Sequence, residues 1–235
     1  MPMNPAFGVV RNLAVKAVGA VHRFNRDRMH GSNIRNPYLD GPARPLSSEL
    51  TIKSQIVRGD IPPALDGCYS RIGPNPIGKV NPANHHWFVG DGMLHGVRLK
   101  NGAALWYRNR WLRSTAVSEA LMESPKPGPR RYSDNVNTNV VKHAGQTWAL
   151  VEAGAWPVRV DSHLETVAHD PFGGSLKGSF AAHPHLDNKS GELHAICYDA
   201  QEANLIRHVV VGADGKVQRE EPISVRHGPS IHDCT

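Results

Sequence analysis

The chain has 235 residues, of which 40% are hydrophobic and 20% charged, with a formal net charge of +6 at pH 7. This composition excludes general disorder and is typical of a soluble globular protein. The basic residues are spread out except near the N-terminus, so we expect no nucleic-acid partner. Cys68, Cys197 and Cys234 are odd in number and far apart, which predicts small, buried, reduced side chains and no disulfide framework.

The N-terminal segment from Phe7 to Met29 combines apolar residues at helical spacing with basic residues on the other side. It predicts an amphipathic helix, although no run of about 20 apolar residues could span a bilayer. Such a helix can lie on an anionic membrane surface and collect a lipid-soluble substrate, or it can dock on its own domain or form an arm. We therefore predict a cytoplasmic protein with an N-terminal arm (residues 1–32), for which peripheral membrane contact through residues 7–29 stays open, and a main domain (residues 33–235).

The rest of the chain is predicted to be almost entirely β. The stretch from Asn33 to Leu46 is rich in Pro, Gly and Asn and predicts an extended linker without regular structure. A short helix is expected near Thr115–Met122, followed by a loop at 124–129. The predicted strands are Gly67–Gly73, Trp87–Val89, Leu94–Lys100, Ala104–Leu112, Asn139–His143, Thr147–Ala153, Leu193–Tyr198, Asn204–Val211 and Val217–Val225.

Hairpin signals join several of these strands. The pairs Asn101-Gly102, Ala144-Gly145 and Asp214-Gly215 favour the tight turns that connect antiparallel strands, and Asp91 is expected to cap a turn of its own. Short antiparallel strands in series indicate a sandwich, a barrel or a propeller. A propeller blade takes about 40–45 residues, so the chain after Leu50 holds material for about three or four blades.

Two histidines lie at the edges of apolar, strand-like stretches. They are His183, in Ala182-His183-Pro184, and His232, in Ile231-His232-Asp233. Two imidazoles alone make a poor metal site, because zinc and iron centres normally take at least three protein ligands. On a strand, His185 shares a face with His183 and is a rival ligand on spacing alone.

Five sequence blocks resemble those of a known protein family and occur in the same order. They are Gly59-Asp60-Ile61-Pro62 with Arg71-Ile72-Gly73-Pro74-Asn75-Pro76, then Trp87-Phe88-Val89-Gly90-Asp91-Gly92-Met93-Leu94-His95, then Asn137-Thr138-Asn139 with Ala149-Leu150-Val151-Glu152, then Ala182-His183-Pro184 with Gly191-Glu192-Leu193, and Ile231-His232-Asp233. In these blocks the chain resembles the N-terminal part of the carotenoid cleavage oxygenases, which include apocarotenoid and lignostilbene dioxygenases and the retinoid isomerase.

The resemblance implies an all-β fold, a partial seven-bladed β-propeller that follows an N-terminal amphipathic helix. It implies one Fe(2+) on the propeller axis, held by four histidines, of which His183 and His232 match the first two. The other two would lie in blades absent from this chain. Seven blades need roughly 280–315 residues, so the resemblance predicts that this chain is a truncated, inactive part of an Fe(II)-dependent dioxygenase.

Glu152 matches the family position whose carboxylate orients the second histidine ligand, so the resemblance assigns it to His232. Orienting carboxylates of this kind are common around metal-bound imidazoles. The alternative is a surface glutamate, which its apolar neighbours make less favourable. The histidines His85, His86 and His95 fall in or beside a block that is structural in the family, and we expect hydrogen-bonded strand or loop residues there.

The expected partners are O₂ and an apolar polyene, because the parent enzyme would split a conjugated C=C bond of a carotenoid or apocarotenoid into carbonyl products. The lignostilbene-cleaving branch, which this chain also resembles, has a lysine at the position of Val151. The valine offers no charged partner to a phenolate. Tyr107 falls near a substrate-contacting tyrosine of that branch and points the other way. A lignostilbene-type dioxygenase is therefore the alternative, and a non-catalytic β-rich binding or scaffold protein is the alternative of another class.

Overall fold

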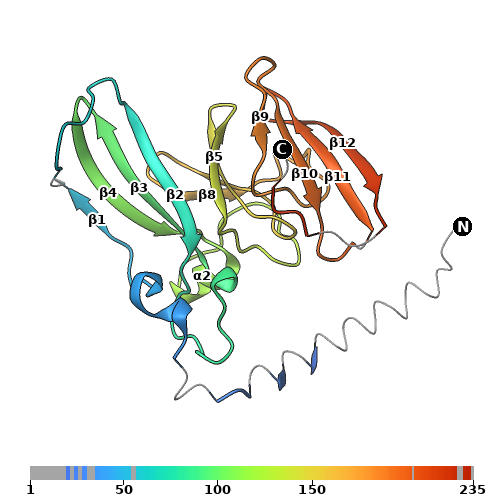
Figure 1. The fold of residues 1–235 in the computed structure, drawn as a ribbon, viewed down its shortest axis with the longest axis horizontal. Helices are drawn as coiled ribbons and strands as arrows, with labels where there is room; N and C mark the ends of the chain where they lie inside the picture. The colour runs from blue at the N-terminus through green and yellow to red at the C-terminus, as the bar shows by residue number, and fades with distance from the viewer. Residues whose placement is uncertain are drawn as a thin grey trace, which may run out of the picture. The chain divides into compact units, whose positions relative to one another are not determined.

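The structure is a computed structural model that describes residues 20–21, 24–25, 28–30, 35–53, 57–202, 204–226 and 230–233 (Figure 1). The chain divides into two compact units, one comprising residues up to Pro45 together with Lys79–Trp87, and the other comprising Leu46–Gly78 with the residues from Phe88 onward. Most of the predicted N-terminal helix lies outside the described residues, although residues 20, 21, 24 and 25 have helical backbone. The division predicted at residue 32 stays a prediction.

In the first unit, the predicted linker contains two short 3₁₀ helices, η1 (Pro37–Leu39) and η2 (Gly41–Ala43). The expectation of no regular structure was therefore wrong for these residues. Each helix has a proline in its first turn and a capping side chain before it: Asn36 accepts a hydrogen bond from the N–H of Tyr38, and Asp40 from that of Gly41. A proline in the first turn and a capping side chain before it both favour the start of a helix. Residues that are typical of linkers can therefore also begin a short 3₁₀ helix.

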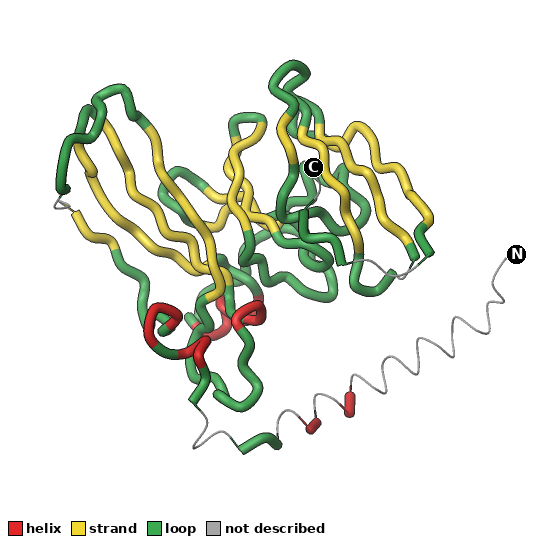
Figure 2. The backbone as a smooth tube through the Cα atoms, in the orientation of Figure 1, coloured by secondary structure: helices red, strands yellow, loops and turns green. Residues whose placement is uncertain are grey.

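The second unit contains three antiparallel sheets of four strands each. The first has the order β1 (Thr51–Lys53), β4 (Ala103–Trp111), β3 (Gly92–Lys100), β2 (Gly67–Pro74); the second β5 (Asn139–His143), β6 (Gln146–Leu150), β7 (Val158–Val160), β8 (Thr166–His169); the third β12 (Val217–Ser224), β11 (Leu205–Val211), β10 (Leu193–Tyr198), β9 (His185–Leu186). Figure 2 shows the strands in three groups. The all-β prediction is therefore confirmed, and three sheets of four antiparallel strands agree with the estimate of material for three or four propeller blades.

Several boundaries differ from the predictions. Trp87–Val89 is a 3₁₀ helix, η3, and not a strand; its three side chains are 49%, 76% and 61% exposed, so no buried face favours strand pairing there. The strand predicted to reach Ala153 ends at Leu150, because the backbone of Ala153 turns to a φ of +58°. The predicted helix is α2 (Thr115–Ala120), with Ser114 as its N-cap. Sequence patterns did not reveal the short strands β1, β7, β8 and β9.

Two of the three predicted hairpin turns have the expected backbone. The pairs Asn101-Gly102 and Ala144-Gly145 have positive φ at both residues, at 50° and 75° and at 49° and 73°, as primed turns require. In Asp214-Gly215 only Gly215 has a positive φ, of 77°, so the β11–β12 connection uses a longer turn.

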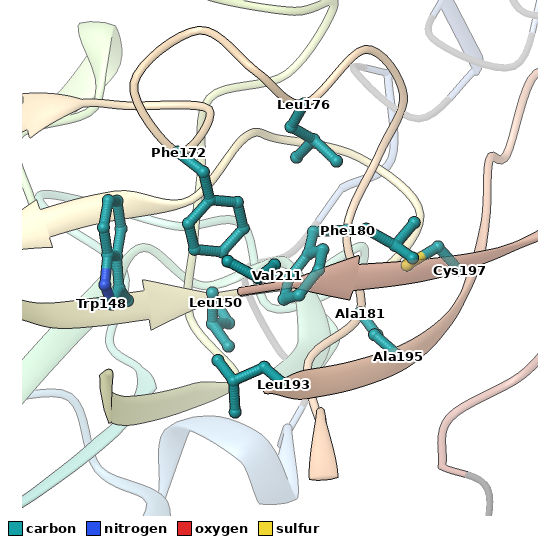
Figure 3. Close-up of a cluster of buried hydrophobic side chains, with 11 residues drawn as sticks. Trp148, Leu150, Phe172, Leu176, Phe180, Ala181, Leu193, Ala195, Cys197 and Val211 are labelled. Atoms are coloured by element: carbon teal, nitrogen blue, oxygen red, sulfur yellow. The ribbon is translucent and has the colours of Figure 1, made fainter. Parts of the chain in front are cut away.

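The second sheet, β5–β8, is buried on both faces. Alternate side chains of β6 point to opposite sides of the sheet and enter different core clusters. Trp148 and Leu150 belong to core cluster 1, which contains side chains of β10 and β11, whereas Ala149 belongs to core cluster 2, which contains Leu94 of β3. Figure 3 shows core cluster 1, formed by Trp148, Leu150, Phe172, Leu176, Phe180, Ala181, Leu193, Ala195, Cys197, Val209 and Val211. Core cluster 2 is formed by Leu94, Leu112, Val136, Ala149, Ala155, Val158, Val160 and Leu164.

The cysteines fit the prediction only in part. Cys197 is fully buried in core cluster 1, whereas Cys68 is exposed, contrary to the expectation of a buried side chain. Cys68 lies on β2, an edge strand of the first sheet whose residues are exposed or partly exposed. Cys234 lies outside the described residues. Within the described residues, the structure has no helix long and apolar enough to cross a membrane.

Candidate metal centre

His183 lies in the loop between β8 and β9, directly after the buried residues 178–182. Phe180 and Ala182 of this loop are 1% and 0% exposed, and the side-chain amide of Asn139, on β5, donates to the carbonyl oxygen of Ala182 at 2.8 Å. The Nε2 atom of His183 is buried and has no hydrogen-bond partner among the described residues. A buried polar atom without a partner is costly, and a metal ion is one partner that an imidazole nitrogen can take.

His232 lies beside His183 and is held by Glu152. The two imidazole rings have centroids 4.5 Å apart and planes at 69°, and Nδ1 of His232 lies 2.8 Å from Oε2 of Glu152. An ionised carboxylate only accepts hydrogen bonds, so Nδ1 carries a proton, and in the neutral imidazole Nε2 then keeps its lone pair. This arrangement of carboxylate, histidine and open nitrogen is typical of metal ligation.

Glu152 is itself placed by the turn that ends β6. The next residue, Ala153, has a φ of +58° and forms an isolated parallel bridge with Asp199. The hydroxyl of Tyr132 contacts the Ala153 carbonyl oxygen and lies 3.2 Å from Oδ1 of Asp199, whose other oxygen pairs with Arg131. Burial, together with the charge of Asp199, raises the pKa of Tyr132 to about 12, so this hydroxyl stays a donor at neutral pH.

The rival His185 lies on β9 and is engaged elsewhere. Its Nε2 lies 2.9 Å from Oδ1 of Asp233, so by the same reasoning its Nε2 carries a proton and donates. The structure thus brings His183, His232 and Glu152 together and turns His185 to another partner.

The remaining predicted structural histidines have contacts of their own. His95 Nδ1 lies 2.8 Å from the hydroxyl of Tyr107 on the neighbouring strand, and burial, followed by the charge of Arg71, lowers the pKa of His95. The ring of His86 packs against that of Tyr38, with centroids 4.8 Å apart. Burial, followed by the charge of His86, lowers the pKa of His85.

The imidazoles of His183 and His232 supply part of the donor set that a metal site needs. In the parts of the chain that the structure describes, no group of three or more His, Cys, Asp or Glu side chains is arranged to hold a metal ion. Imidazole nitrogens suit Fe(II) as well as Zn, Cu and Ni, and a complete site for any of these metals needs more ligands than these two histidines. Sequence reasoning did not single out Asn139, Tyr132 or Asp199. The only sequence signal for Asn139 is its place in the block Asn137-Thr138-Asn139, which resembles the family.

Comparisons with known proteins agree with this fold. Residues 43–235 match the family model described as RPE65, retinal pigment epithelial membrane protein. The carotenoid cleavage oxygenase of Mycobacterium tuberculosis is 46% identical over 202 residues, which are 84% of this chain and 40% of that protein. The carotenoid 9,10(9',10')-cleavage dioxygenase 1 of Phaseolus vulgaris is 30% identical over 237 residues, 87% of this chain and 43% of that protein.

A solved structure shows the same architecture. The lignostilbene dioxygenase of Pseudomonas brassicacearum superimposes with a TM-score of 0.72 at 25% identity, over 85% of this chain and 45% of that one. The chain therefore spans less than half the length of the relatives that it matches, and its three sheets are blades of a β-propeller. Because the family model covers most of the chain and its blades match, this chain belongs to the carotenoid cleavage oxygenase family.

Proposed function

We propose that this chain forms part of an Fe(II)-dependent dioxygenase that cleaves a conjugated C=C bond of a carotenoid or apocarotenoid into two carbonyl products. The names of the relatives support the reaction class. The observation that carries the proposal is the pair His183 and His232, whose rings are 4.5 Å apart, next to the carboxylate of Glu152.

In this proposal His183 and His232 hold the iron through their Nε2 atoms, and Glu152 holds His232 in the required tautomer. Neutral imidazole ligands leave the charge of Fe(II) undiminished, and a bound Fe(II) supplies the activation of O₂ that an organic side chain cannot. Two further histidine ligands would have to come from outside this chain. The buried surroundings of His183 keep water from its nitrogen, which favours the iron as its partner.

The residues near Glu152 favour an apolar polyene as substrate. Val151 is partly buried against core cluster 2 and offers no cation to a phenolate. Tyr107 already shares a hydrogen bond with His95, which supports its interpretation as a strand aromatic. The structural likeness to a lignostilbene dioxygenase keeps a stilbene as the second candidate. Turnover of β-apocarotenal and of a hydroxylated stilbene by one preparation would decide between the two substrates.

We also propose peripheral contact of residues 7–29 with an anionic membrane surface. Val21 and Phe24, which belong to the predicted apolar face, are 58% and 55% exposed on helical backbone. Binding to anionic vesicles should be lost on Phe24→Asp and kept in neighbouring His30→Asn. Equal binding of both variants would contradict this contact.

The test of the proposed function is iron content together with product formation, in a protein of the relatives' length that carries these residues. His183→Ala and His232→Ala should each lose stoichiometric iron and the aldehyde products. The matched control is His163→Ala, an exposed histidine in the turn between β7 and β8, which should keep both. Retained iron and turnover in either ligand variant would refute the assignment.

The 235-residue chain alone gives a complementary expectation. Since its two imidazoles are fewer than iron normally requires, we expect it neither to retain stoichiometric Fe(II) after gel filtration nor to cleave carotenoids. Tight iron in the purified chain would show that other residues complete the site.

A further inference from the structure

The segment 230–233 is attached to two different sheets by two adjacent side chains. His232 Nδ1 lies 2.8 Å from Glu152, which follows β6 of the second sheet. Asp233 Oδ1 lies 2.9 Å from Nε2 of His185, which lies on β9 of the third sheet. Two anchors at neighbouring residues define both the position and the direction of the chain at His232.

We propose that His185 is a positioning residue, which sets the place of the His232 ring by binding Asp233; this inference rests on the proposed role of His232 as an iron ligand. The carboxylate of Asp233 can only accept, so His185 donates from Nε2. His185 is thus oriented as a hydrogen-bond donor and not as a ligand.

The spacing explains how this anchor acts on the metal centre. His183 and His185 are separated by one residue at the start of the third sheet, while His232 and Asp233 are adjacent. In this proposal, holding Asp233 against His185 places the preceding residue next to His183, and the two ring centroids are 4.5 Å apart.

His232 needs such an anchor more than His183 does. The His232 side chain is 66% exposed, so packing restrains it little, and one hydrogen bond to Glu152 leaves the ring free to turn about that contact. The His185 and Asp233 side chains are themselves 49% and 50% exposed. A polar contact this exposed adds little to the stability of the fold, so its removal should displace His232 without unfolding the chain.

The test uses the isotope-labelled, metal-free 235-residue chain. In solution, a nuclear Overhauser cross-peak between the rings of His183 and His232 reports their distance. His185→Ala and Asp233→Ala should each abolish this cross-peak. His185→Gln, whose side-chain amide can donate to Asp233 as Nε2 does, should retain it. The matched control is His163→Ala, an exposed histidine in the turn between β7 and β8, which should leave the cross-peak unchanged.

A cross-peak that persists in both His185→Ala and Asp233→Ala would overturn the proposal, as would its absence from the unsubstituted chain. If His185→Ala does not fold, the result for Asp233→Ala decides. Because no metal is involved, the outcome is separate from the proposed function: retention of iron by the full-length His232→Ala variant would refute the ligand role while leaving this anchor intact.

Discussion

The two histidines of the candidate metal centre belong to regions that are stabilised in different ways. His183 follows a loop whose side chains Phe172, Phe180 and Ala181 are buried in core cluster 1. His232 lies in the segment 230–233, whose residues are exposed or partly exposed. Two side-chain pairs attach this segment to the sheets, His232 with Glu152 and Asp233 with His185. The position of the first histidine therefore depends on folding of the core, and the position of the second on individual polar contacts.

This difference predicts which substitutions change the stability of the fold and which change only the metal site. Damage to core cluster 1 should destabilise the second and third sheets together with His183. Damage to the polar contacts of His232 should change metal binding at nearly constant stability.

The largest effect is expected from truncation of the core beneath His183. The ring of Phe172 is 1% exposed and packs against Trp148 and Phe180, at centroid distances of 4.7 and 4.9 Å. Phe172→Ala should lower the free energy of unfolding by about 3–5 kcal/mol, through lost burial and the cavity left behind. Chemical denaturation measures this. The control Tyr69→Ala, at a site 68% exposed, should cost far less, and an equal loss in both variants would contradict the comparison.

A smaller effect, restricted to the metal, is expected at Glu152. Glu152→Gln keeps the shape of the side chain but removes the charge that orients His232. In a protein with the complete ligand set, metal affinity should fall by about 10–100-fold. The free energy of unfolding of the 235-residue chain should change by no more than about 0.5 kcal/mol. Glu192→Gln, which alters the exposed partner of His194, is the control and should leave metal affinity unchanged. A large stability loss in Glu152→Gln would instead make Glu152 part of the fold.

The smallest effect is expected at Asn139, which holds the backbone directly before His183. Asn139→Ala removes the hydrogen bond from β5 to the Ala182 carbonyl oxygen, 2.8 Å long. One such bond contributes about 0.5–1.5 kcal/mol to stability, and we expect a loss in that range, with the His183 ring signals shifted in the NMR spectrum. Asn188→Ala, in the exposed β9–β10 turn, should change neither. Unshifted His183 signals in Asn139→Ala would show that the loop is held by its apolar side chains alone.

Local sequence patterns predicted the strands that have long alternating burial or clear turns. The predicted strand Leu193–Tyr198 agrees with β10 at both ends, because Leu193, Ala195 and Cys197 face the core while the residues between them are only partly buried. The strands of two to four residues escaped prediction. A strand as short as His185–Leu186 has no periodicity to detect and exists only through pairing with β10.

Tertiary contacts also decided what some motif residues do. Asp91 was expected to cap a turn of its own, yet its carboxylate accepts from the N–H of Ile77 at 2.9 Å, 14 residues away. The neighbouring Gly92 has an ordinary backbone conformation, but a Cβ atom there would lie 1.8 Å from the carbonyl oxygen of Val136. No local pattern contains these approaches, since they join segments far apart in the chain.

The sequence by itself determined the all-β class, the family, and the proposal of His183, His232 and Glu152 as site residues, since these follow from alternation, turn residues and motif order. Only the tertiary structure placed the two imidazoles side by side, directed Glu152 to Nδ1 of His232 and engaged His185 with Asp233. The physical reason is that these contacts span up to 80 residues. Their geometry is set by how the second and third sheets pack around core cluster 1, and that packing depends on many side chains at once.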